Sequence, residues 1–192
     1  MSGNYDHIKR ANDDYAASFD RGGKPIPPAK QAAVLTCMDA RIMPAEALGF
    51  ELGDVHVIRN AGGRASDDAI RSLVISHKLL GTKEFYVIHH TDCGMGMFDQ
   101  ATMETLLESS LNTATPRPDG WTDPGGEDGS QEGRFIKWLT FSDAAEAVTE
   151  DVTRIRNHKL VPGRIPVYGF IYDVDTGKLA EIEAASAAGR AR

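Results

Sequence analysis

Three residues that bind metal ions well stand at the ends of two apolar segments of this sequence. Cys37 ends the run AAVLTC, and His90 and Cys93 lie in the run FYVIHHTDCGMG at residues 85–96. Thiolate and imidazole are ligands that zinc prefers, and catalytic zinc sites commonly keep three protein ligands with water in the fourth position. Cys37, His90 and Cys93 therefore form a candidate Cys2His zinc site with one position open.

Spacing alone leaves several interpretations of these residues open. His89 and His90 point to opposite faces of a strand, so only one of them can share an ion with the cysteines, and spacing does not select it. Cys37 and Cys93 would also be compatible with a disulfide or with two buried, inert thiols. A redox dithiol is disfavoured because the two residues lack the Cys-x-x-Cys spacing.

Charged residues follow Cys37 directly. Asp39 and Arg41 lie in the run CMDAR, and a carboxylate and a guanidinium beside a buried sheet edge are costly unless they pair or serve a site. The run RNAGG, residues 59–63, ends another apolar segment, and its glycines are also typical of a plain turn. Open parallel sheets bind their ligands where the carboxyl ends of the strands meet, so we expect these segments to share one site.

The elements that would position these residues follow from hydrophobic patterns. Residues 32–37, 55–60 and 84–90 are short, continuous apolar runs, which are typical of strands buried on both faces of a parallel sheet. Residues 66–80 have an apolar stripe at helical spacing, and Gly81 is a suitable stop. Strand, helix and strand at this spacing predict a right-handed βαβ unit.

The rest of the chain completes an α/β fold. Residues 4–19 predict an amphipathic helix within an N-terminal helical arm over residues 1–30. A further helix is expected from Ser142, followed by the strands PVYGFIYDV and KLAEIE joined by a DTG turn, and the tail AASAAGRAR is expected to be frayed. Residues 112–133, rich in Pro, Gly and acidic residues, predict an insertion loop that is either a mobile lid or a segment pinned by Trp121.

Length and charge limit the fold and the partners. We expect one domain over residues 1–192, with a mostly parallel central sheet flanked by helices, an antiparallel edge strand and the N-terminal arm. Lys and Arg total 21 against 28 Asp and Glu, and the net charge of -7 without a basic run argues against a nucleic-acid partner. The polar start and the lack of a long apolar run argue against membrane association and favour a cytoplasmic protein.

Taken together, the motifs resemble those of the β-class carbonic anhydrase family. CMDAR at 37–41, HVIRNAGG at 56–63 and HTDCGM at 90–95 match the family's Cys-x-Asp-x-Arg and His-x-x-Cys pattern, and the likeness covers about residues 25–110 and 140–183. The insertion falls outside it. The resemblance selects His90 over His89. It assigns Cys37, His90 and Cys93 to one Zn²⁺ per subunit, Asp39 and Arg41 to catalysis, and Asn60, Ala61, Gly62 and Gly63 to the wall of the substrate cleft.

This resemblance implies attack of zinc-bound hydroxide on the carbon of a small linear heterocumulene. The reaction is either hydration of carbon dioxide to bicarbonate or hydrolysis of carbonyl sulfide to carbon dioxide and hydrogen sulfide, because the short-form subgroup contains enzymes of both kinds. Family members exchange N-terminal helices in dimers, and some form tetramers, so a homodimer or homotetramer is expected. The alternative is a non-catalytic, zinc-stabilised binding module with Asp39 as a fixed fourth ligand, which would not need Arg41.

Overall fold

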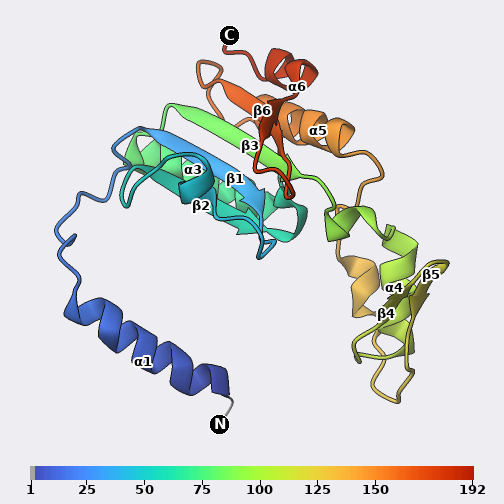
Figure 1. Cartoon of the computed structure of the whole chain (residues 1–192). Helices are drawn as coiled ribbons and strands as arrows, with labels where there is room; N and C mark the ends of the chain where they lie inside the picture. The colour runs from blue at the N-terminus through green and yellow to red at the C-terminus, as the bar shows by residue number, and fades with distance from the viewer. Residues whose placement is uncertain (1–2) are drawn as a thin grey trace.

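A five-stranded sheet with the order β2-β1-β3-β6-β7 forms the centre of the structure, a computed structural model that describes residues 3–192 (Figure 1). The first four strands in this order are parallel, and β7 pairs antiparallel with β6 at the edge. The predicted fold class is therefore confirmed. The strands of this sheet are β1 (Ala32–Cys37), β2 (Val55–Asn60), β3 (Glu84–His90), β6 (Val167–Tyr172) and β7 (Leu179–Glu181).

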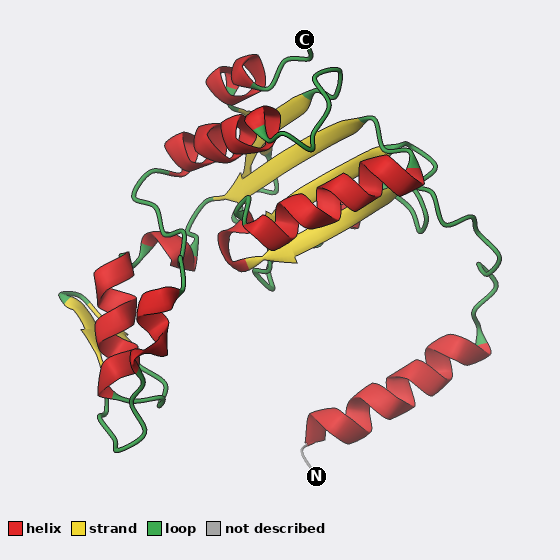
Figure 2. Cartoon of the chain, turned by 180° about the vertical axis from the view of Figure 1, so that it is seen from behind, coloured by secondary structure: helices red, strands yellow, loops and turns green. Residues whose placement is uncertain are grey.

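Helices α3, α5 and α6 lie against one face of the sheet (Figure 2). α3 connects β2 to β3 as predicted, with the Ser66 hydroxyl accepting a hydrogen bond from the Ala69 N–H and Gly81 ending the helix at a φ of 78°. The core between this face and the helices comprises Ala33, Leu35, Ala65, Ala69, Ile70, Leu73, Phe85, Val87, Val148, Val152, Ile155, Val161, Ile165, Val167 and Ala185.

The tail differs from the expectation of a frayed end. It forms α6, in which Ala185 is fully buried against the core that α5 and β6 share. The Gly189 carbonyl then accepts a hydrogen bond of 2.9 Å from the Val167 N–H, which ties the tail to β6. Small alanine side chains allow this close packing, so a composition typical of a loose tail builds part of the core. The bounds are α3 (Asp67–Leu80), α5 (Ala144–Asn157) and α6 (Glu183–Ala188).

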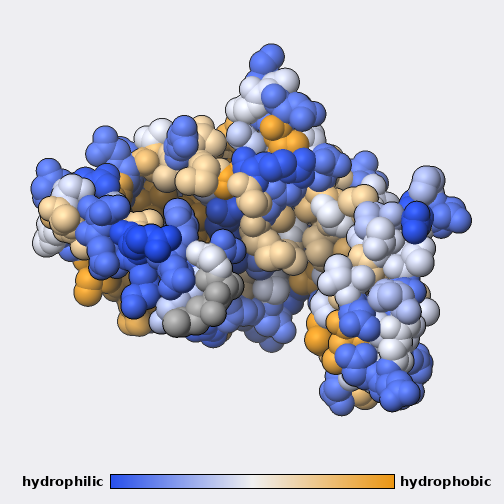
Figure 3. Space-filling view, turned by 60° about the horizontal axis from the view of Figure 1, so that its bottom comes forward, coloured by the Kyte–Doolittle hydropathy of each residue, from blue (hydrophilic) through white to orange (hydrophobic). Residues whose placement is uncertain are grey.

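Two parts of the chain project from the sheet. α1 (Gly3–Ala17) lies apart from the other elements in Figures 1 and 2, and none of residues 3–17 is buried. At the other side, residues 97–138 form a lobe whose surface is partly apolar (Figure 3). Exposed large hydrophobic side chains of the lobe are Met97, Leu111, Phe135 and Ile136.

The predicted insertion loop, residues 112–133, lies in this lobe and contains a small hairpin. Its Trp121 indole N–H donates to the Met97 carbonyl at 3.2 Å and its ring packs edge-on against Phe98, so Trp121 anchors the segment. Within residues 3–192, no helix has the length and apolar character needed to span a bilayer. The remaining short elements are α2 (Pro44–Ala47), η1 (Ala61–Gly63), η2 (Gly94–Gly96), α4 (Gln100–Ser109), β4 (Thr115–Arg117), β5 (Gly120–Thr122) and η3 (Gln131–Phe135).

Candidate metal centre

Two neighbouring parallel strands bring Cys37, His90 and Cys93 together. β1 and β3 pair in register up to Thr36 and Ile88, so their carboxyl ends meet at one edge of the sheet. After His90 the backbone turns sharply, with Asp92 at a φ of 52°, and this turn brings Cys93 back toward Cys37. The three ligand atoms all lie within 4.8 Å of one another. A tetrahedral zinc ion with bonds of about 2.3 Å to sulfur would hold two sulfurs ~3.8 Å apart, so the spacing fits this ion.

The protonation of His90 also fits a metal ligand. Its Nδ1 lies 2.8 Å from the Thr91 carbonyl, which can only accept a hydrogen bond, so Nδ1 carries the proton. Nε2 then offers a lone pair, and this buried atom has no hydrogen-bond partner among the described residues. A backbone carbonyl that fixes the imidazole in this way is typical of metal-binding histidines.

The charges of the three groups depend on one another. The Cys93 thiol donates to the Cys37 sulfur and lowers the pKa of Cys37 to about 4, although burial opposes this shift. The pKa of Cys93 is raised because its proton is shared with Cys37 and because the thiol is buried. Burial alone would lower the pKa of His90, but the negative charge of the nearby Cys37 sulfur raises it. A divalent cation would replace the shared proton and stabilise both thiolates.

Asp39 lies beside this cluster, held by Arg41. The Arg41 side chain donates to both carboxylate oxygens, from Nε to Oδ1 at 3.0 Å and from Nη2 to Oδ2 at 2.8 Å. These hydrogen bonds keep the pKa of Asp39 well below its usual range. The Asp39 Oδ2 atom is 3.8 Å from His90 Nε2, so an ionised carboxylate faces the space where a metal and its water would lie. Arg41 also donates to the Asp92 carboxylate at 2.7 Å, which ties the CMDAR segment to the turn before Cys93.

The turn after β2 supports the Cys37 sulfur. The Gly62 N–H donates to Cys37 Sγ at 3.3 Å. A side chain at Gly63 would meet the Cys37 nitrogen at 2.9 Å, and its φ of 67° also requires glycine. The Asn60 side chain donates to the Arg64 carbonyl at 2.7 Å and so closes the turn. The structure thus gives this segment a supporting contact to the cluster, while its contact with substrate stays a prediction.

Several charged residues around the cluster were given no role by the sequence analysis. Arg59 donates from Nε to the Cys37 carbonyl at 3.0 Å and from Nη2 to the Asp39 carbonyl at 2.7 Å, and so fixes the backbone that carries the predicted site. The position of Arg59 near the carboxyl end of β2, at the same edge of the sheet as Cys37, could have indicated this role. Arg64 and Asp151 are also buried nearby. Asp151 interrupts the apolar stripe of α5, and that interruption was the signal for it.

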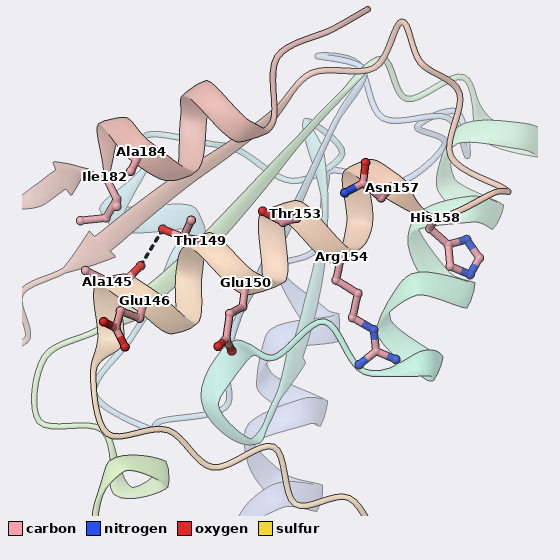
Figure 4. Close-up of a pocket in the computed structure, with 10 residues that line it drawn as sticks. All are labelled: Ala145, Glu146, Thr149, Glu150, Thr153, Arg154, Asn157, His158, Ile182 and Ala184. Atoms are coloured by element: carbon pink, nitrogen blue, oxygen red, sulfur yellow. Dashed lines mark hydrogen bonds between the residues drawn. The ribbon is translucent and has the colours of Figure 1, made fainter.

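A large hollow elsewhere on the protein contains none of the candidate metal ligands. It has a volume of about 1000 Å³ and lies on the outer side of α5, where Glu146, Glu150 and Arg154 project around small residues (Figure 4). Its lining contains no cysteine and none of the three candidate metal ligands. Size alone therefore does not identify the functional site, and the donor atoms at the sheet edge do.

Known proteins are similar to this chain in sequence and in fold. A family model described as carbonic anhydrase matches residues 32–179. The chain is 39% identical to the β-carbonic anhydrase 1 of Mycobacterium tuberculosis over 89% of this chain and 93% of that protein. It is 37% identical to the carbon disulfide hydrolase of an Acidianus species over 87% and 83% of the two chains. Among solved structures, the carbonic anhydrase of Streptococcus mutans aligns with a TM-score of 0.79 and 40% identity, covering 95% of this chain and 99% of that chain.

Proposed function

The chain belongs to the β-carbonic anhydrase family, and on that premise we propose that it is a zinc enzyme that hydrates carbon dioxide to bicarbonate. The observation that carries the proposal is the convergence of Cys37, His90 and Cys93 to within 4.8 Å, with the ionised Asp39 beside them. These three side chains would hold the ion. Bound zinc supplies a water ligand acidic enough to act as a nucleophile and a Lewis acid for the charge that develops on the substrate.

Asp39 would orient the attacking water. With zinc bound, its Oδ2 atom would accept a hydrogen bond from a water on the ion and would be the first acceptor for the proton that leaves. Two thiolates cancel the formal charge of a zinc ion, so the water is less acidic than at a site with three histidines, and this help from Asp39 matters more.

Arg41 would keep Asp39 ready for this role. A bidentate pair holds the carboxylate ionised and fixes its direction. The same pairing argues against the alternative of a binding module with Asp39 as a permanent fourth ligand, because a closed zinc site has no use for a guanidinium on that carboxylate.

Hydrolysis of carbon disulfide or carbonyl sulfide is a second candidate activity. The relative from Acidianus is named a carbon disulfide hydrolase, and all three substrates are small, linear and apolar with an electrophilic carbon. Carbonyl sulfide was the sulfur substrate expected from the sequence, and the comparison adds carbon disulfide. We rank carbon dioxide first because the relative from M. tuberculosis and the solved S. mutans structure both carry the name carbonic anhydrase.

Metal analysis together with a three-substrate assay tests the proposal. The purified chain should contain one zinc per subunit and should hydrate carbon dioxide faster than it hydrolyses either sulfur compound. The Cys93→Ser variant is the matched control, because it removes one ligand and should lose both metal and turnover. A wild-type protein with a Cys37–Cys93 disulfide and no zinc would contradict the whole proposal.

We also propose that the subunit pairs with a second copy through α1. This helix exposes Tyr5, Ile8 and Tyr15 by 50%, 65% and 50%, and a free helix of this length is only marginally stable in water. Sedimentation should show a dimer or tetramer that dissociates in the Ile8→Glu variant. Arg10→Gln changes the charge by the same amount on the other side of the helix and should leave assembly intact. A wild-type monomer with full activity would remove this proposal.

A further inference from the structure

Behind the candidate metal centre lies a buried charged group that the proposed mechanism does not use. Arg64, His89 and Asp151 are only 5%, 0% and 2% exposed, and they come from the segment after η1, from β3 and from α5. Ions are rarely buried this deeply unless they are paired, because each loses its hydration. Three separate segments therefore meet at one polar contact inside an apolar core.

The Asp151 carboxylate is the centre of this contact. Its Oδ2 atom lies 3.0 Å from His89 Nε2, where the imidazole N–H donates to it, and 2.8 Å from Arg64 Nε. The Arg64 contact is a close ion pair without the alignment of a straight hydrogen bond. Arg64 Nη2 also reaches the Glu150 carboxylate at 3.3 Å. Glu150 projects from α5 toward the ribbon that follows β2 in Figure 4.

Stability alone is a weak reason for such a group. Buried ion pairs often contribute no more than apolar side chains of the same volume would, whereas they fix the geometry of their partners. The question is then which geometry Arg64, Asp151 and His89 fix.

Phe141 connects the group to the metal ligands. Its ring stacks on the His89 imidazole at 5.7 Å between centroids, and the Arg64 guanidinium lies 5.5 Å from the centre of the same ring. Phe141 in turn packs against the apolar cluster that contains Cys37 and Cys93. A shift of Arg64 or His89 would therefore displace the Phe141 ring, and with it the cluster that contains the two sulfur ligands.

The backbone provides two more direct connections. Arg64 follows the turn whose Gly62 N–H donates to Cys37 Sγ, so a fixed Arg64 holds that N–H against the sulfur. His89 precedes His90, so a clamp on His89 from one face of β3 sets the direction in which His90 projects from the other face.

We propose that Arg64, Asp151 and His89 are positioning residues of the metal centre, which lock the turn behind Cys37 and the end of β3 in the geometry that binds zinc. The inference rests on the proposed zinc function. It predicts that these residues act on metal affinity although none of them touches the metal. Partners of metal ligands typically change metal affinity or activity by about tenfold to a hundredfold.

The Asp151→Asn variant tests the proposal. Zinc affinity, measured by competition with a chelator well below the melting temperature, should fall about tenfold or more. Glu150→Gln is the matched control, because it makes the same chemical change at the neighbouring position of α5 on an exposed side chain, and its affinity should stay within about twofold of the wild type. A residue with a merely structural role would lower the melting temperature and leave the affinity of the folded protein unchanged.

Two further variants keep the test decisive if Asp151→Asn does not fold. The pair Arg64→Met with Asp151→Leu leaves no unpaired buried charge, and Arg64→Lys keeps the charge but not the planar guanidinium. Either folded variant should bind zinc more weakly than the wild type. Wild-type affinity in a folded Asp151→Asn, Arg64→Lys or Arg64→Met/Asp151→Leu variant would overturn this inference, whereas a wild-type protein without zinc affinity would overturn the proposed function instead.

Discussion

His89 and His90 are neighbours on one strand, yet they have opposite surroundings. Both are almost fully buried, at 0% and 1% exposure. His90 faces two sulfurs with a free Nε2 lone pair, whereas His89 donates to the Asp151 carboxylate on the other face of the sheet. Histidine thus serves as a candidate ligand at position 90, on one face of the strand, and as part of a buried charged group at position 89, on the other face. The role of each histidine is decided by the residues that its face of the strand meets, because the two side chains are chemically identical.

The largest expected effect separates the two histidines directly. His90→Ala should abolish zinc binding and turnover, because it leaves a pair of thiols with too few ligands for a stable tetrahedral site. His89→Ala should retain zinc with affinity reduced about tenfold, since it removes a supporting contact and no ligand. Zinc content after gel filtration and the rate of carbon dioxide hydration measure both. If His89→Ala lost the metal and His90→Ala kept it, the assignment of the two faces would be wrong.

The charged group on the His89 side should dominate folding stability. Asp151→Ala leaves the buried Arg64 with only the exposed Glu150 carboxylate, and removing one member of a buried ion pair typically costs about 3–5 kcal/mol. Urea unfolding followed by circular dichroism measures this change in the free energy of unfolding. Asp92→Ala is the comparison, because Asp92 also pairs with an arginine but is exposed to solvent, and it should cost far less. Equal losses of unfolding free energy in the two variants would contradict the distinction between the buried and the exposed ion pair.

The charged pair on the His90 side should instead dominate turnover. Asp39→Asn keeps the shape of the side chain but removes the acceptor charge, so kcat should fall by about 100-fold or more while zinc content is retained. Steady-state kinetics with elemental analysis test this. Loss of zinc together with activity would favour the alternative in which Asp39 is itself a permanent ligand.

The smallest effect concerns pH. Hydrogen bonds from Arg41 place the pKa of Asp39 below its ordinary value of 3.8. Because the folded-state pKa is the lower one, this pair stabilises the fold above pH 3.8 and loses the contribution as the pH falls below that value. Arg41→Met should therefore lower the melting temperature at pH 7 and differ less from the wild type at pH 3. The pH at which the turnover rate falls on the acid side should also move higher in this variant. An unchanged pH dependence would contradict the proposal that Arg41 keeps Asp39 ionised.

Most of the fold was predictable because it depends on local patterns. Apolar runs gave β1, β2 and β3, but β2 is an edge strand and is not buried on both faces as predicted. The Ser66 cap and the Gly81 stop bounded α3 closely. The β4–β5 hairpin was not predicted, because its segment lacks an apolar period. α4 was also not predicted, although the Asp99 cap and the spacing of Met103, Leu106 and Leu107 were signals for it. α6 was missed for another reason: a helix of six residues is not stable by itself, and the burial of Ala185 in the core stabilises it.

By itself the sequence determined which donor groups exist and that Cys37, His90 and Cys93 stand at strand ends, because the order of residues along a strand is local. Spacing alone did not separate His89 from His90, and the family resemblance selected His90, which the tertiary structure places beside both sulfurs. Only the tertiary structure decided that Arg64, 87 residues from Asp151, pairs with it behind this cluster. The physical reason is that the pairing of strands and the packing of α5 set these distances. A pattern of neighbours along the chain contains no information about which distant side chain each face will meet.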